Sequence, residues 1–465
     1  MRKTAYFAGK HVHLMGIGGC GVSALVPLLH DAGATVDGCD LASGRTVARL
    51  REDGVDVTLG HDPAHVERCD MVVHTGAVSE EHIELRAARA RGLPVLGRSA
   101  CLAELMRGSR TVAVAGSHGK TSTTWMLAHL LTAAGCDPMV MVGGSVSATG
   151  FNGGRVGSDD LFIAEVDESD GGFAHVAPTV AVVTNLEPEH TRHYGGFAPL
   201  CRAFGDWLAQ VPAHGAVVTA RAAVPPDVFA GLRAPVIDCS AAADTGGSTE
   251  PDYRAHEVAL AAEGSSCRVR ERGEDIGTLR VPLPGRHMVH DALLALAAAR
   301  LLVPDLRAEL LAGCERVRRR FTCHGWPDGV RVVEDYAHHP TEIAATVAAA
   351  ALGGGRVHAI FQPHRYSRTA DCFEGFIAAF AGVEALAILP VYAAGEEPIA
   401  GAGGRDLAEA VARQRGDRRA MVQYVRQPDA AVAYLAARAR PGDTCLVLGA
   451  GDVNRCCRPL VEALA

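Results

Sequence analysis

Short apolar runs alternate with longer stretches rich in Ala and Leu along most of the chain, and glycine-rich or polar segments separate them. Residues 12–15, 112–115 and 180–183 are apolar runs of strand length, and residues 121–131 have the composition of a helix. Strands that alternate with helices are typical of α/β layers built on parallel sheets. The pattern therefore predicts an α/β protein.

The length of 465 residues corresponds to about three domains of roughly 150 residues each. Three strand and helix groups follow one another, and each contains a strand that runs into a glycine turn. We place the domains at residues 1–106, 107–313 and 314–465. The small polar segment 240–250 is expected to be a surface loop.

Composition narrows the class of protein. No uninterrupted apolar stretch approaches the roughly 18 residues that cross a bilayer, and the first ten residues lack the apolar core of a signal peptide, so we expect a cytoplasmic protein without membrane insertion.

The 14 cysteines form no C-x-x-C pair, so their spacing favours free thiols over disulfides and does not match a zinc-binding motif. With a formal charge of -8, binding to nucleic acid would need a local basic face, and the one arginine cluster, residues 316–320, is too short to provide it. Small anionic molecules are therefore the more fitting ligands.

The first glycine turn follows the apolar run 12–15 and precedes an Ala/Leu-rich segment that we expect to be helical to about Ala32. Its candidate ligand-binding residues are Gly16, Gly18, Gly19, Gly21 and Ser23, together with Asp40 at the end of a second strand, 35–40. A strand, a glycine turn, a helix and a strand that ends in an acid form the layout of a dinucleotide-binding unit. Taken alone, this layout leaves a nicotinamide dehydrogenase open as an alternative.

The second glycine turn contains Lys120, the only lysine after residue 10. Residues 112–124 read VAVAGSHGKTSTT, so a strand would lead into Gly116, Ser117, His118 and Gly119, and a helix would begin near Thr121 and Ser122. Backbone N–H groups of such a turn can face phosphate oxygens, a lysine meets the β- and γ-phosphates, and a threonine hydroxyl reaches Mg²⁺. The G-x-x-G-K-T spacing is shorter than the full phosphate-loop motif, so a packing turn is the alternative.

Acidic residues crowd the end of another expected strand. Residues 162–170 read FIAEVDESD, which places Glu165, Asp167, Glu168 and Asp170 close together. Like charges at this density are costly unless a cation is present. Downstream, the apolar run 180–183 leads to His190, and carboxyl ends of parallel strands are where such folds place ligands. Glu165 and His190 are therefore candidate metal ligands.

These motifs, together with DYAHHPTE at 335–342, FQPHRYSRT at 361–369 and VYAAGEEPI at 391–399, make the chain resemble the Mur ligase family over nearly its whole length. The resemblance implies an N-terminal Rossmann-like domain for a UDP-sugar, a central P-loop-type ATPase domain with a mixed sheet, and a C-terminal Rossmann-like domain that closes over ATP and receives an amino acid. It weakens the dehydrogenase interpretation.

The resemblance also implies roles for particular residues. Lys120 would grip the ATP phosphates, and two Mg²⁺ ions would be held by Thr121, Glu165 and His190. Other residues expected at the ATP site are Arg320, Asp335, Tyr336, Met288 and Asp291. Residues expected at the substrates are Thr75, Gly76, Ala77, His338, Arg365 and Arg368. His338 would also be a candidate base for the amino group.

The expected activity is ATP-dependent formation of an amide bond between the lactyl carboxylate of UDP-N-acetylmuramate and a free amino acid such as L-alanine, through an acyl phosphate, in peptidoglycan precursor synthesis by a monomer or homodimer. Met288 and Asp291 stand where the family usually has two asparagines, and residues 75–78 and 81–84 also depart from its pattern. A paralogue that joins a different carboxylate or amine therefore stays open. A non-catalytic nucleotide-binding regulator is the third possibility.

Overall fold

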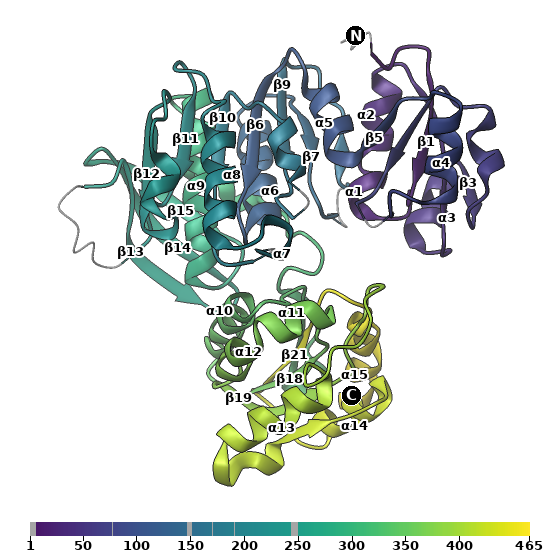
Figure 1. The fold of residues 1–465 in the computed structure, drawn as a ribbon. Helices are drawn as coiled ribbons and strands as arrows, with labels where there is room; N and C mark the ends of the chain where they lie inside the picture. The colour runs from purple at the N-terminus through teal and green to yellow at the C-terminus, as the bar shows by residue number, and fades with distance from the viewer. Residues whose placement is uncertain (1–5, 77, 147–150, 170, 190, 243–249) are drawn as a thin grey trace. The chain divides into compact units, whose positions relative to one another are not determined.

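The computed structural model describes residues 6–76, 78–146, 151–169, 171–189, 191–242 and 250–465. The chain divides into two compact units, one formed by residues 1–256, 268–279 and 290–315, the other by residues 257–267, 280–289 and 316–465. Three sheets with flanking helices make up the fold, which confirms the α/β class (Figure 1). The expected site residues Ala77 and His190, and the acidic Asp170, lie outside the described residues.

The first sheet is parallel throughout, with strand order β3-β2-β1-β4-β5. Its strands are β1 (His11–Met15), β2 (Thr35–Asp40), β3 (Asp56–Leu59), β4 (Met71–His74) and β5 (Val95–Gly97). Its helices are α1 (Cys20–Ser23), α2 (Leu25–Asp31), α3 (Arg45–Glu52), α4 (Ile83–Ala90) and α5 (Arg98–Met106). This strand order is that of a Rossmann-like fold, as expected.

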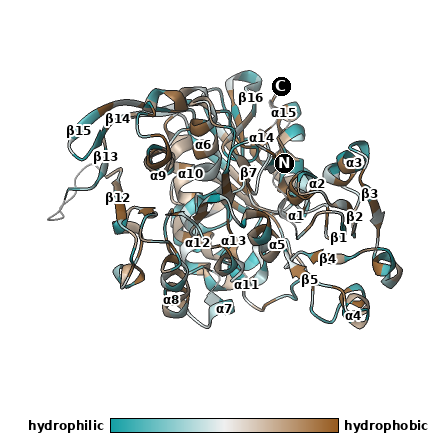
Figure 2. Ribbon diagram, turned by 90° about the horizontal axis from the view of Figure 1, so that it is seen from above, coloured by the Kyte–Doolittle hydropathy of each residue, from teal (hydrophilic) through white to brown (hydrophobic). Residues whose placement is uncertain are grey.

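The outer helices of this sheet are amphipathic. In α3 the buried residues Val47 and Leu50 lie three positions apart and share one helix face, and four of the other six residues are charged. Figure 2 shows hydrophilic and hydrophobic residues side by side on both α3 and α4. Burial of one apolar stripe is thus what attaches these helices to the sheet.

The second sheet has ten strands in the order β15-β14-β13-β12-β11-β10-β6-β9-β7-β8. Its strands are β6 (Arg110–Ala115), β7 (Met139–Met141), β8 (Gly154–Arg155), β9 (Leu161–Glu165), β10 (Val180–Val183), β11 (Ala216–Thr219), β12 (Val236–Ser240), β13 (Tyr253–Ala261), β14 (Gly264–Glu271) and β15 (Glu274–Val281). Its helices are α6 (Lys120–Ala133), α7 (Thr191–Tyr194), α8 (Phe197–Leu208) and α9 (Arg286–Leu302). Strands β9, β6, β10 and β11 are parallel neighbours, whereas β8 is antiparallel to β7, so the sheet is mixed.

The third sheet has the order β16-β17-β21-β18-β19-β20, and only the edge strand β16 is antiparallel to its neighbour. Its strands are β16 (Thr322–Gly325), β17 (Arg331–Asp335), β18 (Val357–Phe361), β19 (Val383–Ile388), β20 (Val422–Tyr424) and β21 (Thr444–Leu448). Its helices are α10 (Pro340–Ala351), α11 (Tyr366–Asp371), α12 (Phe373–Ala379), α13 (Gly404–Gln414), α14 (Pro428–Ala436) and α15 (Cys457–Leu464). This is the second Rossmann-like sheet of the expected fold.

Two further expectations can be compared with the structure. All 14 cysteines are free, and most of them are buried, as the scattered spacing indicated. Among the described residues, no helix has both the length and the apolar character needed to cross a membrane.

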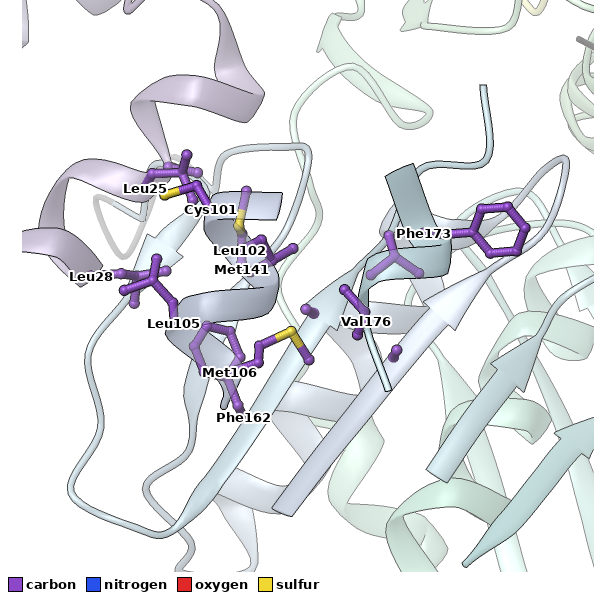
Figure 3. Packing of buried hydrophobic residues seen from close by; sticks show 14 of the residues in the cluster. Leu25, Leu28, Cys101, Leu102, Leu105, Met106, Met141, Phe162, Phe173 and Val176 are labelled. Atoms are coloured by element: carbon purple, nitrogen blue, oxygen red, sulfur yellow. The ribbon is translucent and has the colours of Figure 1, made fainter. Parts of the chain in front are cut away.

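One apolar core joins the first sheet to the second. It contains residues from α2 and α5 together with residues from β6, β9 and α8. Figure 3 shows Leu25 and Leu28 of α2 beside Cys101 and Leu105 of α5, with Phe162 of β9 below them. The glycine turn after β1 and the glycine turn after β6 therefore belong to layers that share a core.

Leu28 provides a test of this shared core, because its side chain is fully buried in it. We expect Leu28→Ala to lower the free energy of unfolding by about 3 kcal/mol, since the change removes buried methyl groups and leaves a cavity. Denaturant unfolding followed by circular dichroism measures the effect. The matched change Leu301→Ala, at a partly exposed position, should stay within about 0.5 kcal/mol; equal losses in the two variants would contradict this account of the core.

Candidate active site

The loop between β6 and α6 needs its two glycines for different reasons. Gly116 has φ of +130° and lies so close to β10 that a Cβ atom there would be 2.2 Å from Thr184 Oγ1. Gly119 has φ of +80° at the N-cap of α6, a left-handed conformation that favours glycine. The loop thus makes a close approach to β10 and then turns directly into the helix.

The end of β10 holds the loop by hydrogen bonds. The backbone N–H of Ser117 donates to Asn185 O at 3.0 Å, and that of His118 donates to Asn185 Oδ1 at 3.0 Å. Thr184 Oγ1 donates to His118 O at 2.6 Å. Two of the loop amides expected to face phosphate are therefore committed to Asn185, and an anion would meet the N–H groups at the start of α6 instead.

Lys120 is held at the centre of the acidic cluster. Its Nζ donates to Glu168 Oε1 at 2.9 Å and to Gly116 O at 2.6 Å. Burial alone would lower the pKa of Lys120, but the carboxylates of Glu168 and Asp167 outweigh it and raise that pKa above its ordinary value. Lys120 is therefore cationic at neutral pH, as phosphate binding requires.

The carboxylates around Lys120 differ in their electrostatics. Burial raises the pKa of Glu168 to about 7, and Asp167 adds to this, although Lys120 acts in the opposite direction. Burial also acts to raise the pKa of Asp167, but Lys120 and Arg98 prevail and hold that pKa far below its usual range. Acidic side chains outnumber basic ones here, so the cluster can accept a proton or a further cation.

Thr121 and Glu165 offer oxygen donors side by side. Thr121 Oγ1 donates to Glu165 Oε1 at 2.9 Å, and Glu165 Oε2 accepts from the backbone N–H of Gly143 at 2.6 Å. Hydroxyl and carboxylate oxygens are the donors that Mg²⁺ takes in proteins. The structure thus brings together the two expected metal ligands that it describes.

Helix α9 contributes an acid to the same loop. Asp291 is buried, and a Cβ atom at Gly119 would lie 2.5 Å from Asp291 Oδ1. The neighbouring His290 makes a 3.0 Å contact from Nε2 to Thr184 O. Asp291 therefore lies against the end of the loop that leads into α6, and Met288 lies three residues earlier on the first turn of α9.

The glycine turn after β1 is braced by the residues expected at the UDP-sugar. The N–H of Gly18 donates to Asp40 Oδ2 at 2.9 Å, and the N–H of Gly19 donates to Gly16 O at 3.0 Å. A Cβ atom at Gly16 would lie 2.7 Å from a methyl carbon of Thr75. Ser23 Oγ donates to Cys20 O in the first helical turn. Because Gly16 and Gly18 have no side chain, Thr75 and Asp40 can approach the turn this closely.

Arg98 is a residue that the sequence analysis missed. It is the first residue of α5, and its Nη2 donates to Asp167 Oδ2 at 3.0 Å. A Cβ atom at Gly21 would lie 2.6 Å from Arg98 Nη1. The arginine therefore connects the first glycine turn with the acidic cluster. No sequence signal marked it, because it lies far from both motifs along the chain.

In the second unit, the expected ATP-binding residues collect at the end of β17. Asp335 is buried and accepts from the backbone N–H groups of Phe321 and Ala337, each at 2.8 Å. Burial raises the pKa of Asp335 to about 6, although Arg320 acts to lower it. The Arg320 guanidinium lies 5.3 Å from the ring of Tyr336. Arg320, Asp335 and Tyr336 thus form one group.

His338 and the arginine pair gather around His364, which the sequence analysis had not singled out. The rings of His338 and His364 lie 6.0 Å apart, and His364 stacks on Tyr392 with ring centroids at 5.4 Å. Burial lowers the pKa of His364 to about 3, and the charges of His338, Arg368 and Arg365 contribute. A half-buried neutral imidazole therefore lies within a positively charged group.

Neutral His364 should make stability depend on pH. Its pKa of about 3 in the folded protein lies below the ordinary 6.5, so the unfolded chain binds the proton first and stability falls as pH falls from 6.5 toward 3. On going from pH 7 to pH 5, His364→Gln should lose less stability than the wild type, by up to about 2 kcal/mol. Denaturant titrations at both pH values measure this, with exposed His214→Gln as the control. Parallel losses in all three proteins would contradict the expectation.

Comparisons with known proteins show the family of the chain. Residues 11–110 match the catalytic domain of the Mur ligase family, residues 114–299 match the Mur ligase middle domain, and residues 319–451 match the Mur ligase glutamate ligase domain. The chain is 43% identical to the UDP-N-acetylmuramate--L-alanine ligase of Sorangium cellulosum over 98% of this chain and 96% of that protein. It is 40% identical to the protein of the same name from Phenylobacterium zucineum, over 97% and 95%.

Solved structures match as well. The UDP-N-acetylmuramate-alanine ligase of Thermotoga maritima superposes with a TM-score of 0.79 at 24% identity, over 97% of this chain and 98% of that one, which supports the fold. The UDP-N-acetylmuramate:L-alanyl-gamma-D-glutamyl-meso-diaminopimelate ligase of Neisseria meningitides matches 67% of this chain and 100% of that one, with a TM-score of 0.60 and 29% identity.

Fold, loop chemistry and relatives together define an ATP-dependent, ADP-forming ligase of peptidoglycan precursor synthesis. The chain belongs to the Mur ligase family. The domain boundaries at residues 106 and 313 stay a prediction, as do the individual roles of the site residues.

Proposed function

We propose that the protein joins L-alanine to the lactyl carboxylate of UDP-N-acetylmuramate in the cytoplasm, as a step of cell-wall precursor synthesis. The names of relatives about 40% identical over nearly the whole chain support these two substrates. The observation that carries the proposal is the position of Lys120 beside the paired oxygens of Thr121 and Glu165, at adjoining strand ends. A phosphoryl-transfer site needs a cationic side chain that binds phosphate and, close to it, oxygen ligands that bind Mg²⁺.

Thr121 and Glu165 would hold one Mg²⁺ ion, and His190 would help to hold a second. The donor set fits, because both described side chains present oxygen and the surrounding cluster has more acids than bases. When bound, Mg²⁺ would neutralise phosphate charge and act as a Lewis acid.

In the proposed first step, the lactyl carboxylate attacks the γ-phosphorus of ATP, the bond to the bridging oxygen breaks, and ADP leaves. Lys120 would stabilise negative charge on the phosphates, because its ammonium group stays protonated beside Glu168. Residues 116–119 would place the phosphates at the start of α6, where unpaired helix N–H groups favour anions. The glycine turn 16–21, with Asp40, Thr75 and Gly76, would hold the UDP-sugar.

In the second step, the amino group of L-alanine attacks the acyl phosphate, and phosphate leaves from a tetrahedral intermediate. His338 is the proposed base for the amino group, with Nδ1 placed 3.0 Å from Tyr336 O and 3.3 Å from Glu342 Oε2. Arg365 and Arg368 would bind carboxylate and phosphate charge, a task suited to guanidinium groups. Arg320 and Asp335 would contact ATP phosphate and ribose.

One specific observation supports the alternative that the protein is a paralogue with a different amine substrate. The Neisseria protein, named for ligation of a tripeptide, matches two thirds of this chain at 29% identity. The same carboxylate would then be joined to a peptide instead of an amino acid. Identity of about 40% over the whole chain favours L-alanine.

An amine screen separates these candidates. Purified protein, Mg²⁺, ATP and UDP-N-acetylmuramate are incubated with L-alanine, other amino acids or L-alanyl-γ-D-glutamyl-meso-diaminopimelate, and the product is identified by mass. We expect UDP-N-acetylmuramoyl-L-alanine at roughly 1 per second or faster. Turnover with the tripeptide alone would establish the paralogue, and no turnover with this sugar would overturn the proposed carboxylate.

Lys120→Ala should strongly slow ligation while UDP-N-acetylmuramate binding persists, because the lysine acts on phosphate and not on the sugar. We expect a loss of about 100- to 1,000-fold in kcat, the range seen when a preorganised stabilising group is removed from a transition state. Coupled ADP release measures turnover, and calorimetry measures sugar binding. Lys10→Ala, which removes the nearest lysine outside the site along the chain, is the matched control and should retain activity. Retained ligation by Lys120→Ala would refute the assigned role, and a wild type that binds ATP but does not ligate would favour a regulator.

A further inference from the structure

A second group of potential metal ligands lies on the first sheet, apart from the residues proposed for Mg²⁺. His13 comes from β1, Cys39 from β2, His65 from the 3₁₀ turn Pro63–Glu67, and Glu84 from α4. One ligand atom from each of these four residues lies within 4.8 Å of all the others. Cys39 and Glu84 are fully buried, and His13 is 2% exposed. Polar groups this deeply buried require partners.

The imidazole of His13 has a hydrogen-bond partner at only one of its two ring nitrogens among the described residues. Its Nδ1 lies 2.8 Å from Asp37 Oδ1, which orients the ring. Its Nε2 is buried and, among the described residues, has no hydrogen-bond partner. Metal-binding histidines commonly pair one ring nitrogen with a carboxylate and direct the other at the ion. The Asp37–His13 pair has this arrangement.

The other donor atoms already converge. His65 Nδ1 lies 2.6 Å from Glu84 Oε1, and Cys39 Sγ lies 3.3 Å from Glu84 Oε2. Ligand atoms around a tetrahedral zinc ion are separated by about 3.3–3.8 Å, as follows from bond lengths of about 2.0–2.3 Å. Small side-chain shifts would therefore suffice to place an ion between them.

We propose that His13, Cys39, His65 and Glu84 bind a zinc ion. Two imidazoles, one thiolate and one carboxylate form a donor set that suits Zn²⁺, whereas Mg²⁺ and Ca²⁺ take oxygen ligands. Binding releases the Cys39 thiol proton to solvent, so that the thiolate coordinates the metal. With four protein ligands the site is closed, which is the form of a structural zinc site. His61, whose Nδ1 is 3.2 Å from Glu84 Oε2, lies at its edge.

The position of Cys39 gives the metal a structural consequence. The carbonyl of Cys39 accepts the N–H groups of Gly16 at 2.9 Å and Ile17 at 3.2 Å. Zinc bound at Cys39 Sγ would hold this end of β2 and, through these bonds, the glycine turn after β1. The site would therefore stabilise the first sheet whichever substrate the enzyme uses.

Metal analysis of the full-length protein without a histidine tag tests the proposal. The protein is stripped with a chelator, loaded with Zn²⁺ in the presence of a weak competing chelator, and examined by elemental analysis and thermal unfolding. We expect one tightly bound zinc per chain and a higher midpoint temperature, because a ligand that binds only the folded state stabilises it. Loading with Co²⁺ should give a thiolate-to-cobalt charge-transfer band.

Variants assign the ligands. Cys39→Ser should abolish the cobalt band, His65→Gln should weaken zinc binding by at least about 100-fold, and Asp37→Asn should weaken it by about 10- to 100-fold through loss of ring orientation. Cys69→Ser, at another buried thiol of the same apolar cluster, and His30→Gln, at an exposed histidine, are matched controls that should bind as the wild type does.

Two outcomes would overturn the proposal. One is zinc binding equally weak in the wild type and in Cys39→Ser, which would mean adventitious binding to surface histidines. The other is a cobalt-loaded wild type without a thiolate band, a result that does not depend on whether any variant folds. Neither outcome bears on ligase activity, so failure here is distinguishable from failure of the proposed function.

Discussion

The parallel pairing of β6 with β9 on one side and β10 on the other is the constraint on which the candidate active site depends. Val114 pairs with Glu165, and Ala115 pairs with Val183, so all three strands end at one edge of the sheet. The lysine loop, the acidic cluster and the Thr184–Asn185 brace each follow one of these ends. A register shift of one residue would turn Glu165 to the other face. Strand pairing thus brings together candidate site residues that are spread over about 70 positions of the sequence.

The loop between β6 and α6 is held by protein atoms in this structure, which affects how ligands can bind. Asn185 accepts hydrogen bonds from the backbone N–H groups of Ser117 and His118, and Glu168 accepts a hydrogen bond from Lys120. An anion that uses Lys120 must therefore compete with a carboxylate whose own pKa is already raised to about 7 by burial. Protonation of Glu168 or the arrival of a metal ion would ease this competition, because either reduces the excess of negative charge around the lysine.

Local patterns predicted much of this arrangement. The strand that leads into Gly116 extends over 110–115 and the helix after it over 120–133, close to the expected bounds, because apolar runs and glycine turns are local signals. Arg98, Asn185 and His364 could not be found in this way. Each acquires its role from contacts with residues distant in sequence, and so do His13, Cys39, His65 and Glu84, whose spacing matches no metal-binding motif. A single sequence does not show which distant residues will contact one another in the fold.

Arg98 connects the proposed sugar site with the proposed phosphate site through one side chain. Its guanidinium lies over Gly21 in the first glycine turn and donates to Asp167 in the acidic cluster. The core that joins α2, α5 and β9 holds both layers in place beneath it. A shift of the first turn would therefore move a charge that helps to keep Asp167 ionised. Geometry at the proposed sugar site and electrostatics at the proposed phosphate site are coupled through this contact.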